Sequence, residues 1–197
     1  ILNCLKSSLN QILKNEIIMD LVKVLGCGME IEGKGGKETF DLDQLRWSKV
    51  IICTDADVDG FQIRTLVLTM FYRLMPTLIR ENKIFIAESP LYEVTHRRGR
   101  ERTTYFAYDE REKNELIATF GAESLHLQRS KGLGENDPDM MWHTTMNPET
   151  RRLIEVQVED EESMATMFDL LLGDNLAGRK SYIEEHGEEF LELLDIG

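Results

Sequence analysis

The sequence has 197 residues, of which 42% are hydrophobic and 30% charged, and its formal net charge is -13. This length fits one large domain or two small ones, and the apolar fraction is ordinary for a globular protein, which excludes intrinsic disorder as the class. The three cysteines are widely spaced and form no C-x-x-C pair, so we expect free thiols in a reducing cytoplasm and no zinc site. Every apolar run is shorter than the ~20 residues of a membrane span, which predicts no membrane segment.

The negative charge is concentrated at the end of the chain. From residue 149 onward there are 14 acidic and 4 basic residues, whereas residues 1–96 are nearly balanced, with 13 acidic and 11 basic. An acidic protein is in general a poor ligand for nucleic acid, because phosphate contacts need cations. The balanced first half leaves nucleic-acid binding open.

The first predicted elements are two helices, from apolar positions at helical spacing near residues 9–13 and 18–25, the second ending at Gly26. Residues 30–44 are polar and rich in glycine, which is typical of a long loop. A chain that begins at Ile1 rather than Met is expected to have lost an N-terminal part.

A strand, a helix and a strand are expected next. Residues 50–53 form a short apolar run typical of a buried strand in a parallel sheet, residues 63–78 keep the helical i, i+3, i+4 pattern, and residues 84–87 form a second apolar run. The segment from 50 to 87 is therefore a βαβ unit with a right-handed crossover. The fold class is α/β.

The rest of the chain is mixed and mainly helical. Residues 91–107 predict a hairpin whose tip carries the arginines at 97, 98, 100 and 102, either as a solvated turn or as a contact with DNA. The remaining predicted elements are a helix over 109–120, a glycine-spaced loop over 130–135, a short helix over 137–142, a strand over 153–158 and two helices in the tail.

Three aspartates, Asp55, Asp57 and Asp59, follow the first predicted strand. Ligands bind at the carboxyl ends of the strands in open α/β sheets. In an extended segment, residues two apart point the same way, so the three carboxylates are expected to converge. Like charges at short range repel unless a cation lies between them, and an all-oxygen cluster suits Mg²⁺. The alternative is a solvated turn with helix-capping aspartates.

Two other interpretations of this motif are testable from the residues. An EF-hand calcium loop fails, because its twelfth position falls on Leu66 where a glutamate is needed and because a strand precedes it. A phosphoaspartate-type Mg²⁺ phosphohydrolase or phosphotransferase would use Asp55 as its nucleophile, with Lys131 and Asp174 as later elements. It remains the second hypothesis, weakened by the extra negative charge of Asp59 next to a substrate phosphate.

Lys131 lies between Arg129 and a Gly-Leu-Gly segment. A cation beside glycine-spaced backbone N–H groups can hold a phosphate, although the spacing is not that of a Walker A loop. These two basic residues are therefore candidate DNA contacts, against the alternative of a plain turn.

Several motifs together resemble the C-terminal half of the B subunit of bacterial type IIA topoisomerases, DNA gyrase and topoisomerase IV. They are TDADVDG at 54–60, IRTLVLT at 63–69, ESPLY at 88–92, KGLGE at 131–135, WHTTMNPE at 142–149 and RKSYIEE at 179–185. The resemblance implies a Rossmann-like toprim domain with a parallel sheet over residues 1–95, and a C-terminal tail region over 96–197. It also implies a DNA topoisomerase (ATP-hydrolysing) that acts only within the full A₂B₂ assembly.

Further roles follow from the same resemblance. Asp55 and Asp57 would bind Mg²⁺, Asp55 shared between two metal positions, with Asp59 as a supporting carboxylate and a third ligand, a glutamate, upstream of this sequence. Asn3 becomes a candidate DNA contact. The nucleophilic tyrosine would belong to the A subunit, leaving no catalytic residue in this chain, and ATP would bind a domain outside it. The expected partners are double-stranded DNA and the A subunit, and the sequence does not separate gyrase from topoisomerase IV.

Overall fold

The structure is a computed structural model that describes residues 1–31, 40–130, 132–158 and 160–193. It divides into two compact units that the chain enters more than once. Unit 1 comprises residues 1–52, 62–85 and 155–197, and unit 2 comprises residues 53–61 and 86–154. The sequence analysis expects a boundary between two domains, residues 1–95 and 96–197. That boundary stays a prediction.

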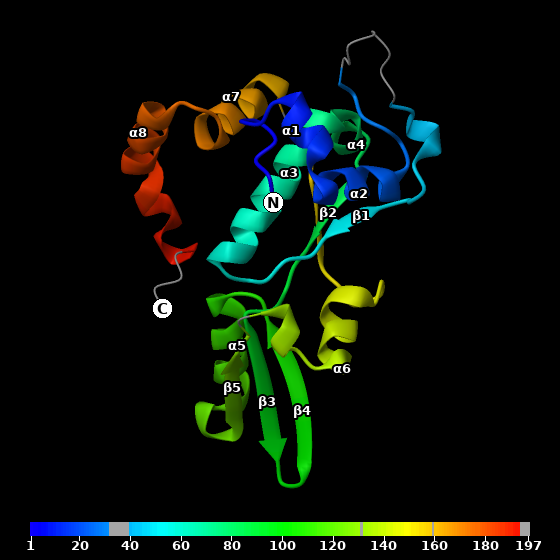
Figure 1. Ribbon diagram of the computed structural model, residues 1–197. Coiled ribbons are helices and arrows are strands. Elements are labelled where there is room, and N and C mark those ends of the chain that lie inside the picture. Colours follow the sequence, from blue (N-terminus) through cyan, green and yellow to red (C-terminus); the bar gives the residue numbers. More distant parts are fainter. Residues whose placement is uncertain (32–39, 131, 159, 194–197) are drawn as a thin grey trace. The chain divides into compact units, whose positions relative to one another are not determined.

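Unit 1 begins with two short helices, α1 (Leu9–Lys14) and α2 (Glu16–Leu25). Ser8 and Asn15 cap them by accepting hydrogen bonds from backbone N–H groups of the first turn, and Gly26 ends α2 in the left-handed conformation. Figure 1 shows both helices in blue and the longer helix α3 (Val58–Leu74) in cyan to green. The predicted helices are confirmed. The loop expected over 30–44 falls mostly outside the described residues, apart from a 3₁₀ turn at Leu42–Gln44.

The predicted βαβ unit is present, with one correction. Strand β1 (Val50–Ile52), helix α3 and strand β2 (Ile84–Ala87) follow each other, and the sheet has the order β1-β2-β6 with a parallel pair. The helix expected to run to residue 78 instead ends at Leu74, and α4 (Pro76–Arg80) follows. Pro76 has no N–H to donate within α3, and its ring would clash with the carbonyl four residues earlier in a continuous helix. Proline is instead favoured at the first position of a helix, so Pro76 begins α4.

The core of unit 1 is built from the apolar positions of these helices. Ile12, Met70, Leu74, Leu78 and Ile84 are completely buried. The tail adds β6 (Leu153–Glu155), which is shorter than the strand predicted over 153–158, and the helices α7 (Glu161–Leu172) and α8 (Leu176–His186), which were expected. A 3₁₀ segment, Gly187–Leu193, ends the described chain.

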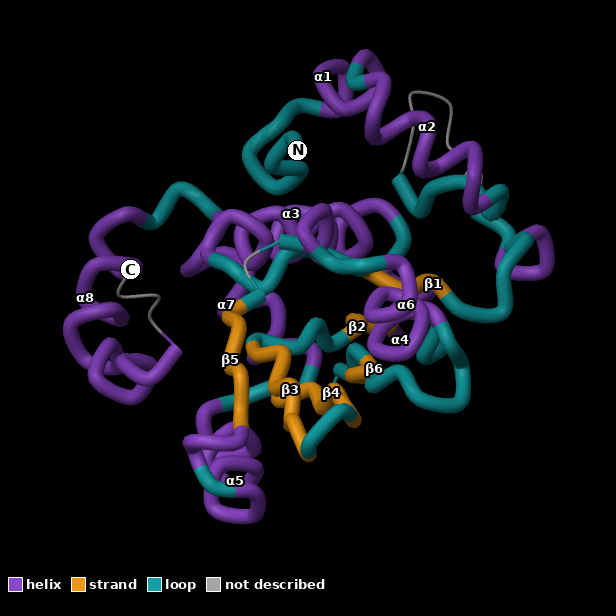
Figure 2. Tube along the Cα trace, turned by 90° about the horizontal axis from the view of Figure 1, so that it is seen from below, coloured by secondary structure: helices purple, strands orange, loops and turns teal. Residues whose placement is uncertain are grey.

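Unit 2 contains an antiparallel sheet with the order β4-β3-β5, from β3 (Tyr92–Arg98), β4 (Glu101–Ala107) and β5 (Leu125–Arg129). Helix α5 (Glu110–Phe120) lies beside this sheet in both Figure 1 and Figure 2, and the Phe120 ring stacks on His96 with ring centres 4.4 Å apart. Helix α6 (Pro138–Met141) and a π-helical turn, Trp142–Met146, complete the unit.

Among the described residues, no helix is long and apolar enough to cross a membrane.

Candidate metal and phosphate site

The aspartates lie in the short connection from the end of β1 to the start of α3. Asp57 caps the helix, because its Oδ1 accepts a hydrogen bond of 2.7 Å from the backbone N–H of Gly60. Asp59 lies in the first helical turn and is exposed, whereas Asp55 and Asp57 are half-buried. The strand thus ends at Ile52, the backbone bends at residues 56 and 57, and the helix begins at Val58.

The expected convergence of three carboxylates is therefore wrong. Within the described ranges, no group of three or more His, Cys, Asp and Glu side chains lies close enough together to hold a metal ion. The physical reason is the cap: once Asp57 turns back toward the N–H of Gly60, the alternation of an extended segment no longer applies to Asp59. The role of each aspartate in metal binding stays a prediction.

A second segment of unit 2 reaches Asp55. The backbone N–H of Leu133 donates a hydrogen bond of 2.8 Å to Asp55 Oδ1. A Cβ atom added to Gly132 would lie 3.7 Å from both carboxylate oxygens of Asp55, so the glycine loop lies directly against this side chain. The sequence singled out this loop as a phosphate site but did not indicate its contact with Asp55.

Gly60 is the other residue that the sequence analysis missed. A Cβ atom there would lie 2.1 Å from the carbonyl oxygen of Asp55, far inside any normal contact. Only glycine fits, and it lets the start of α3 lie against the backbone that carries the carboxylate. The sequence does contain a signal for this close approach, because a glycine ends the segment Asp-Ala-Asp-Val-Asp-Gly at residues 55–60.

The donor set of this site suits a hard cation that keeps most of its water. Asp55 and Asp57 each use one oxygen in a hydrogen bond to backbone and keep a second oxygen. Mg²⁺ commonly takes one or two carboxylates and completes its shell with water and phosphate. The hydroxyl of Thr54, beside Asp55, is buried and has no hydrogen-bond partner among the described residues, so the site also holds an unused polar atom.

The predicted DNA contacts lie in different surroundings. Arg129 ends β5 and is exposed. Lys131 lies outside the described residues. In unit 1, Asn3 accepts a hydrogen bond of 3.0 Å from the N–H of Leu5 and donates one of 3.1 Å to the carbonyl of Leu172, so its amide anchors the start of the chain to α7.

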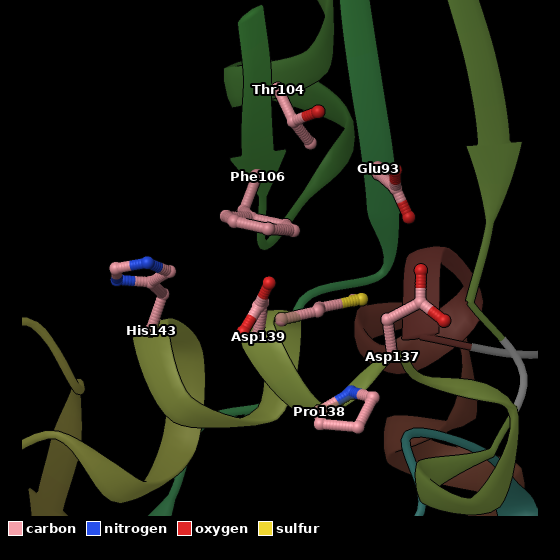
Figure 3. Close-up of a pocket in the computed structure, with 8 residues that line it drawn as sticks. Glu93, Thr104, Phe106, Asp137, Pro138, Asp139 and His143 are labelled. Carbon is pink, nitrogen blue, oxygen red and sulfur yellow. The ribbon is translucent and has the colours of Figure 1, made fainter.

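A cavity of about 520 Å³ opens elsewhere in unit 2. Figure 3 shows the side chains that line it, which come from β3, β4 and the α6 region: Glu93, Thr104, Phe106, Asp137, Pro138, Asp139 and His143, with Met140. As far as the described residues show, the lining holds three carboxylates and no lysine or arginine. Because a phosphate needs cations or free N–H groups, this cavity does not suit one.

Comparison with known proteins agrees with this geometry. Residues 6–90 match the family model of the Toprim domain. This part of the chain is thus similar to a toprim domain, and in the structure it has an α/β fold with acidic residues after its first strand. Residues 122–184 match the family described as "DNA gyrase B subunit, carboxyl terminus".

The curated relatives extend the match over nearly the whole chain. The DNA gyrase B subunit of Thermotoga maritima is 42% identical over 193 residues, covering 98% of this chain and 29% of the relative. The B subunit of DNA topoisomerase 4 from Staphylococcus aureus is 39% identical over 188 residues, covering 95% of this chain and 27% of the relative. The chain is therefore similar, over nearly its whole length, to the toprim and carboxyl-terminal region of type IIA topoisomerase B subunits, and it spans less than a third of the length of these relatives.

The phosphoaspartate hypothesis is not favoured by these matches. Its later element Asp174 is 93% exposed and forms an ion pair of 3.5 Å with Lys6.

Proposed function

We propose that this chain carries the magnesium site of an ATP-dependent type IIA DNA topoisomerase that cleaves and religates double-stranded DNA. The observation that supports it most directly is the position of Asp55. This residue follows β1 in the segment similar to a toprim domain, and its carboxylate accepts a hydrogen bond from the Leu133 N–H. In this proposal residues 1–95 are the toprim domain and residues 96–197 are the tail.

The acidic residues have distinct tasks in the proposed reaction. Asp55 and Asp57 hold Mg²⁺, with Asp59 supporting them by its charge. When bound, the ion stabilises negative charge on the scissile phosphate and on the leaving 3′ oxygen. Both aspartates are oriented in advance by backbone N–H groups, which reduces the rearrangement needed when DNA arrives.

The remaining tasks fall to DNA-facing residues and to the partners. Arg129 and Lys131 contact phosphates, and Asn3 contacts DNA from the start of the chain. A tyrosine of the A subunit attacks the phosphate in an A₂B₂ heterotetramer, and ATP binds a domain of the B subunit beyond this chain. The three cysteines, which are free thiols in the structure, fit the proposed cytoplasmic location.

The test is DNA cleavage by a full-length B subunit that contains this region and is reconstituted with its A subunit. Asp55→Asn should nearly abolish cleavage even at high Mg²⁺, because a ligand shared by two metal positions is lost. Asp57→Asn should keep measurable cleavage that recovers partly as Mg²⁺ rises, because mass action refills a weakened site.

The matched control is Asp20→Asn, which removes an exposed carboxylate whose partner among the described residues is Lys23. It should cleave like the unaltered protein. If Asp55→Asn cleaves like the unaltered protein while remaining folded, the metal assignment is wrong. Turnover of a simple phosphate ester by the B subunit alone, lost in Asp55→Asn, would support the phosphoaspartate alternative instead.

A further inference from the structure

The turn between β3 and β4 concentrates positive charge in an acidic protein. We name residues 97–102 the basic tip; their sequence is Arg-Arg-Gly-Arg-Glu-Arg, with four cations and one anion. All six residues are exposed. The chain as a whole carries a net charge of -13, so this segment has the opposite sign from the chain as a whole.

The arginines of the basic tip, unlike several other cations, have no carboxylate partner among the described residues. Elsewhere Lys23 pairs with Asp20 at 3.0 Å, Arg80 with Glu161 at 2.6 Å and Arg111 with Glu115 at 3.2 Å. Across the residues that the structure describes, no carboxylate lies within 4.0 Å of a guanidinium of the basic tip. Their charge is therefore available to an external anion.

The strand register places two of these arginines side by side. Arg97 is directly opposite Arg102, and Thr95 is directly opposite Thr104 two residues away, on the same face of the hairpin. The two threonine hydroxyls lie 3.5 Å apart. This face thus presents paired guanidinium groups and paired hydroxyls, all of which can donate hydrogen bonds to phosphate oxygens.

The other face of the hairpin is already covered. His96 stacks on Phe120 of α5, and Tyr105 lies with its ring centre 5.0 Å from the same phenylalanine. Like charges directly opposite each other on neighbouring strands repel. Arg97 and Arg102 therefore repel each other on the face turned away from α5. An anion bound between the two guanidinium groups would relieve this repulsion.

We propose that the basic tip binds the phosphodiester backbone of double-stranded DNA, through Arg97, Arg100 and Arg102 with Thr95 and Thr104. The inference rests on the proposed function for its substrate and adds a contact outside the aspartate site. A row of arginines on an open ribbon matches a repeating line of phosphates better than a single small anion.

The chemistry of the basic tip disfavours other polyanionic partners. A membrane-binding segment places large apolar residues beside its cations, and the basic tip has none. Single-stranded nucleic acid is usually held by stacking on exposed aromatic rings, which are also absent from these six residues.

The experiment measures binding of the 197-residue chain to a fluorescein-labelled duplex of mixed sequence by anisotropy, over a series of salt concentrations. The variant Arg97→Gln/Arg100→Gln/Arg102→Gln removes three unpaired charges. The control Lys23→Gln/Arg80→Gln/Arg111→Gln removes three paired ones, so both proteins have the same net charge. Arg98 is kept because Glu101 is its cross-strand neighbour.

The tip variant should bind more weakly, and the slope of log affinity against log salt should fall by about 2 to 3, roughly 0.9 for each lost phosphate contact. The control should keep the slope of the unaltered chain. Replacing the same three arginines by lysine should also keep it, because the charge remains.

Three results would overturn the inference: equal slopes for tip variant and control, no duplex binding by the unaltered chain at low salt, or tighter binding to anionic vesicles or a polyglutamate peptide than to the duplex. None of these depends on DNA cleavage by the reconstituted enzyme. The hairpin inference and the proposed function can therefore fail separately.

Discussion

The backbone N–H of Leu133 lies 2.8 Å from the carboxylate of Asp55, although 78 residues separate them along the chain. A backbone donor fixes the direction of a carboxylate without adding charge, as outer partners of metal ligands commonly do. The glycine loop therefore positions the proposed ligand as well as lying next to it.

Leu133→Pro tests this relationship. Proline removes the N–H but suits the first position of a 3₁₀ turn, and Gly132 already has the extended conformation, φ -146° and ψ 152°, that a residue before proline adopts. Loss of an outer partner should weaken Mg²⁺ binding about tenfold or more, measured as the Mg²⁺ concentration that gives half of the rise in melting temperature. Leu133→Ala, which keeps the donor, should behave like the unaltered chain. Equal Mg²⁺ responses of the two variants would contradict this role.

Gly60→Ala should destabilise the protein even though alanine favours helices. The helix propensity gain is about 1 kcal/mol, while the new Cβ would meet three backbone atoms of Asp55 within 3 Å. Backbone cannot move aside as a flexible side chain does, so a net loss of about 1–3 kcal/mol is expected, measured by urea unfolding. Gly134→Ala meets nothing within 4 Å and serves as the control. A Gly60→Ala protein as stable as this control would show that the approach to Asp55 is not tight.

Asp57 has two separable properties, its helix cap and its charge. Asp57→Ala removes both and should cost about 1 kcal/mol of unfolding free energy, whereas Asp57→Asn keeps a capping oxygen and should unfold at nearly the same urea concentration as the unaltered chain without metal. Both variants should lose much of the stabilisation by Mg²⁺, because a ligand that binds only the folded state raises the free energy of unfolding by an amount that grows with the logarithm of its affinity. If Asp57→Asn keeps the full Mg²⁺ response, this aspartate is a cap alone.

The local elements were predictable because their signals are local. The apolar run over residues 84–87 is the observed strand β2, and Asp109 caps α5 as its position before a helical pattern indicates. The helix pattern over 63–78 continued past Pro76 because apolar spacing carries no information about the missing N–H. The proline was the stronger signal and ended α3 at Leu74.

The site was predictable in part. The position of Asp55 follows from the strand before it. The convergence expected of Asp55, Asp57 and Asp59 assumed an extended backbone, which does not continue past Asp57, where the carboxylate accepts a capping hydrogen bond from the Gly60 N–H. The contact between Asp55 and Leu133 depends on how distant segments of the chain pack. No periodicity or spacing in the sequence encodes it.

Glu110 gives unit 2 a pH dependence whose sign can be worked out. Its carboxylate accepts hydrogen bonds from Lys113 and from the Tyr92 hydroxyl, and Lys113 also lies over the Tyr92 ring, 4.7 Å from its centre. The hydrogen bond from Lys113, and next that from Tyr92, hold the pKa of Glu110 below its ordinary value of 4.5. The ionised form is thus favoured by folding, so its contribution is fully present above pH 4.5 and is lost as the pH falls through the lowered pKa.

Glu110→Gln should therefore reduce the free energy of unfolding at neutral pH, and the difference from the unaltered chain should shrink as the pH falls below 4.5 and through the lowered pKa of Glu110. The carboxylate is exposed, so solvent screening limits the loss to about 1 kcal/mol or less. Urea unfolding at a series of pH values measures it, with Tyr92→Phe and the double variant to separate the two partners. The effects of Tyr92→Phe and Glu110→Gln should not add at neutral pH, because each removes the same hydrogen bond. A difference that stays constant from neutral to acidic pH would show that the charge of Glu110 contributes nothing to the stability of the fold.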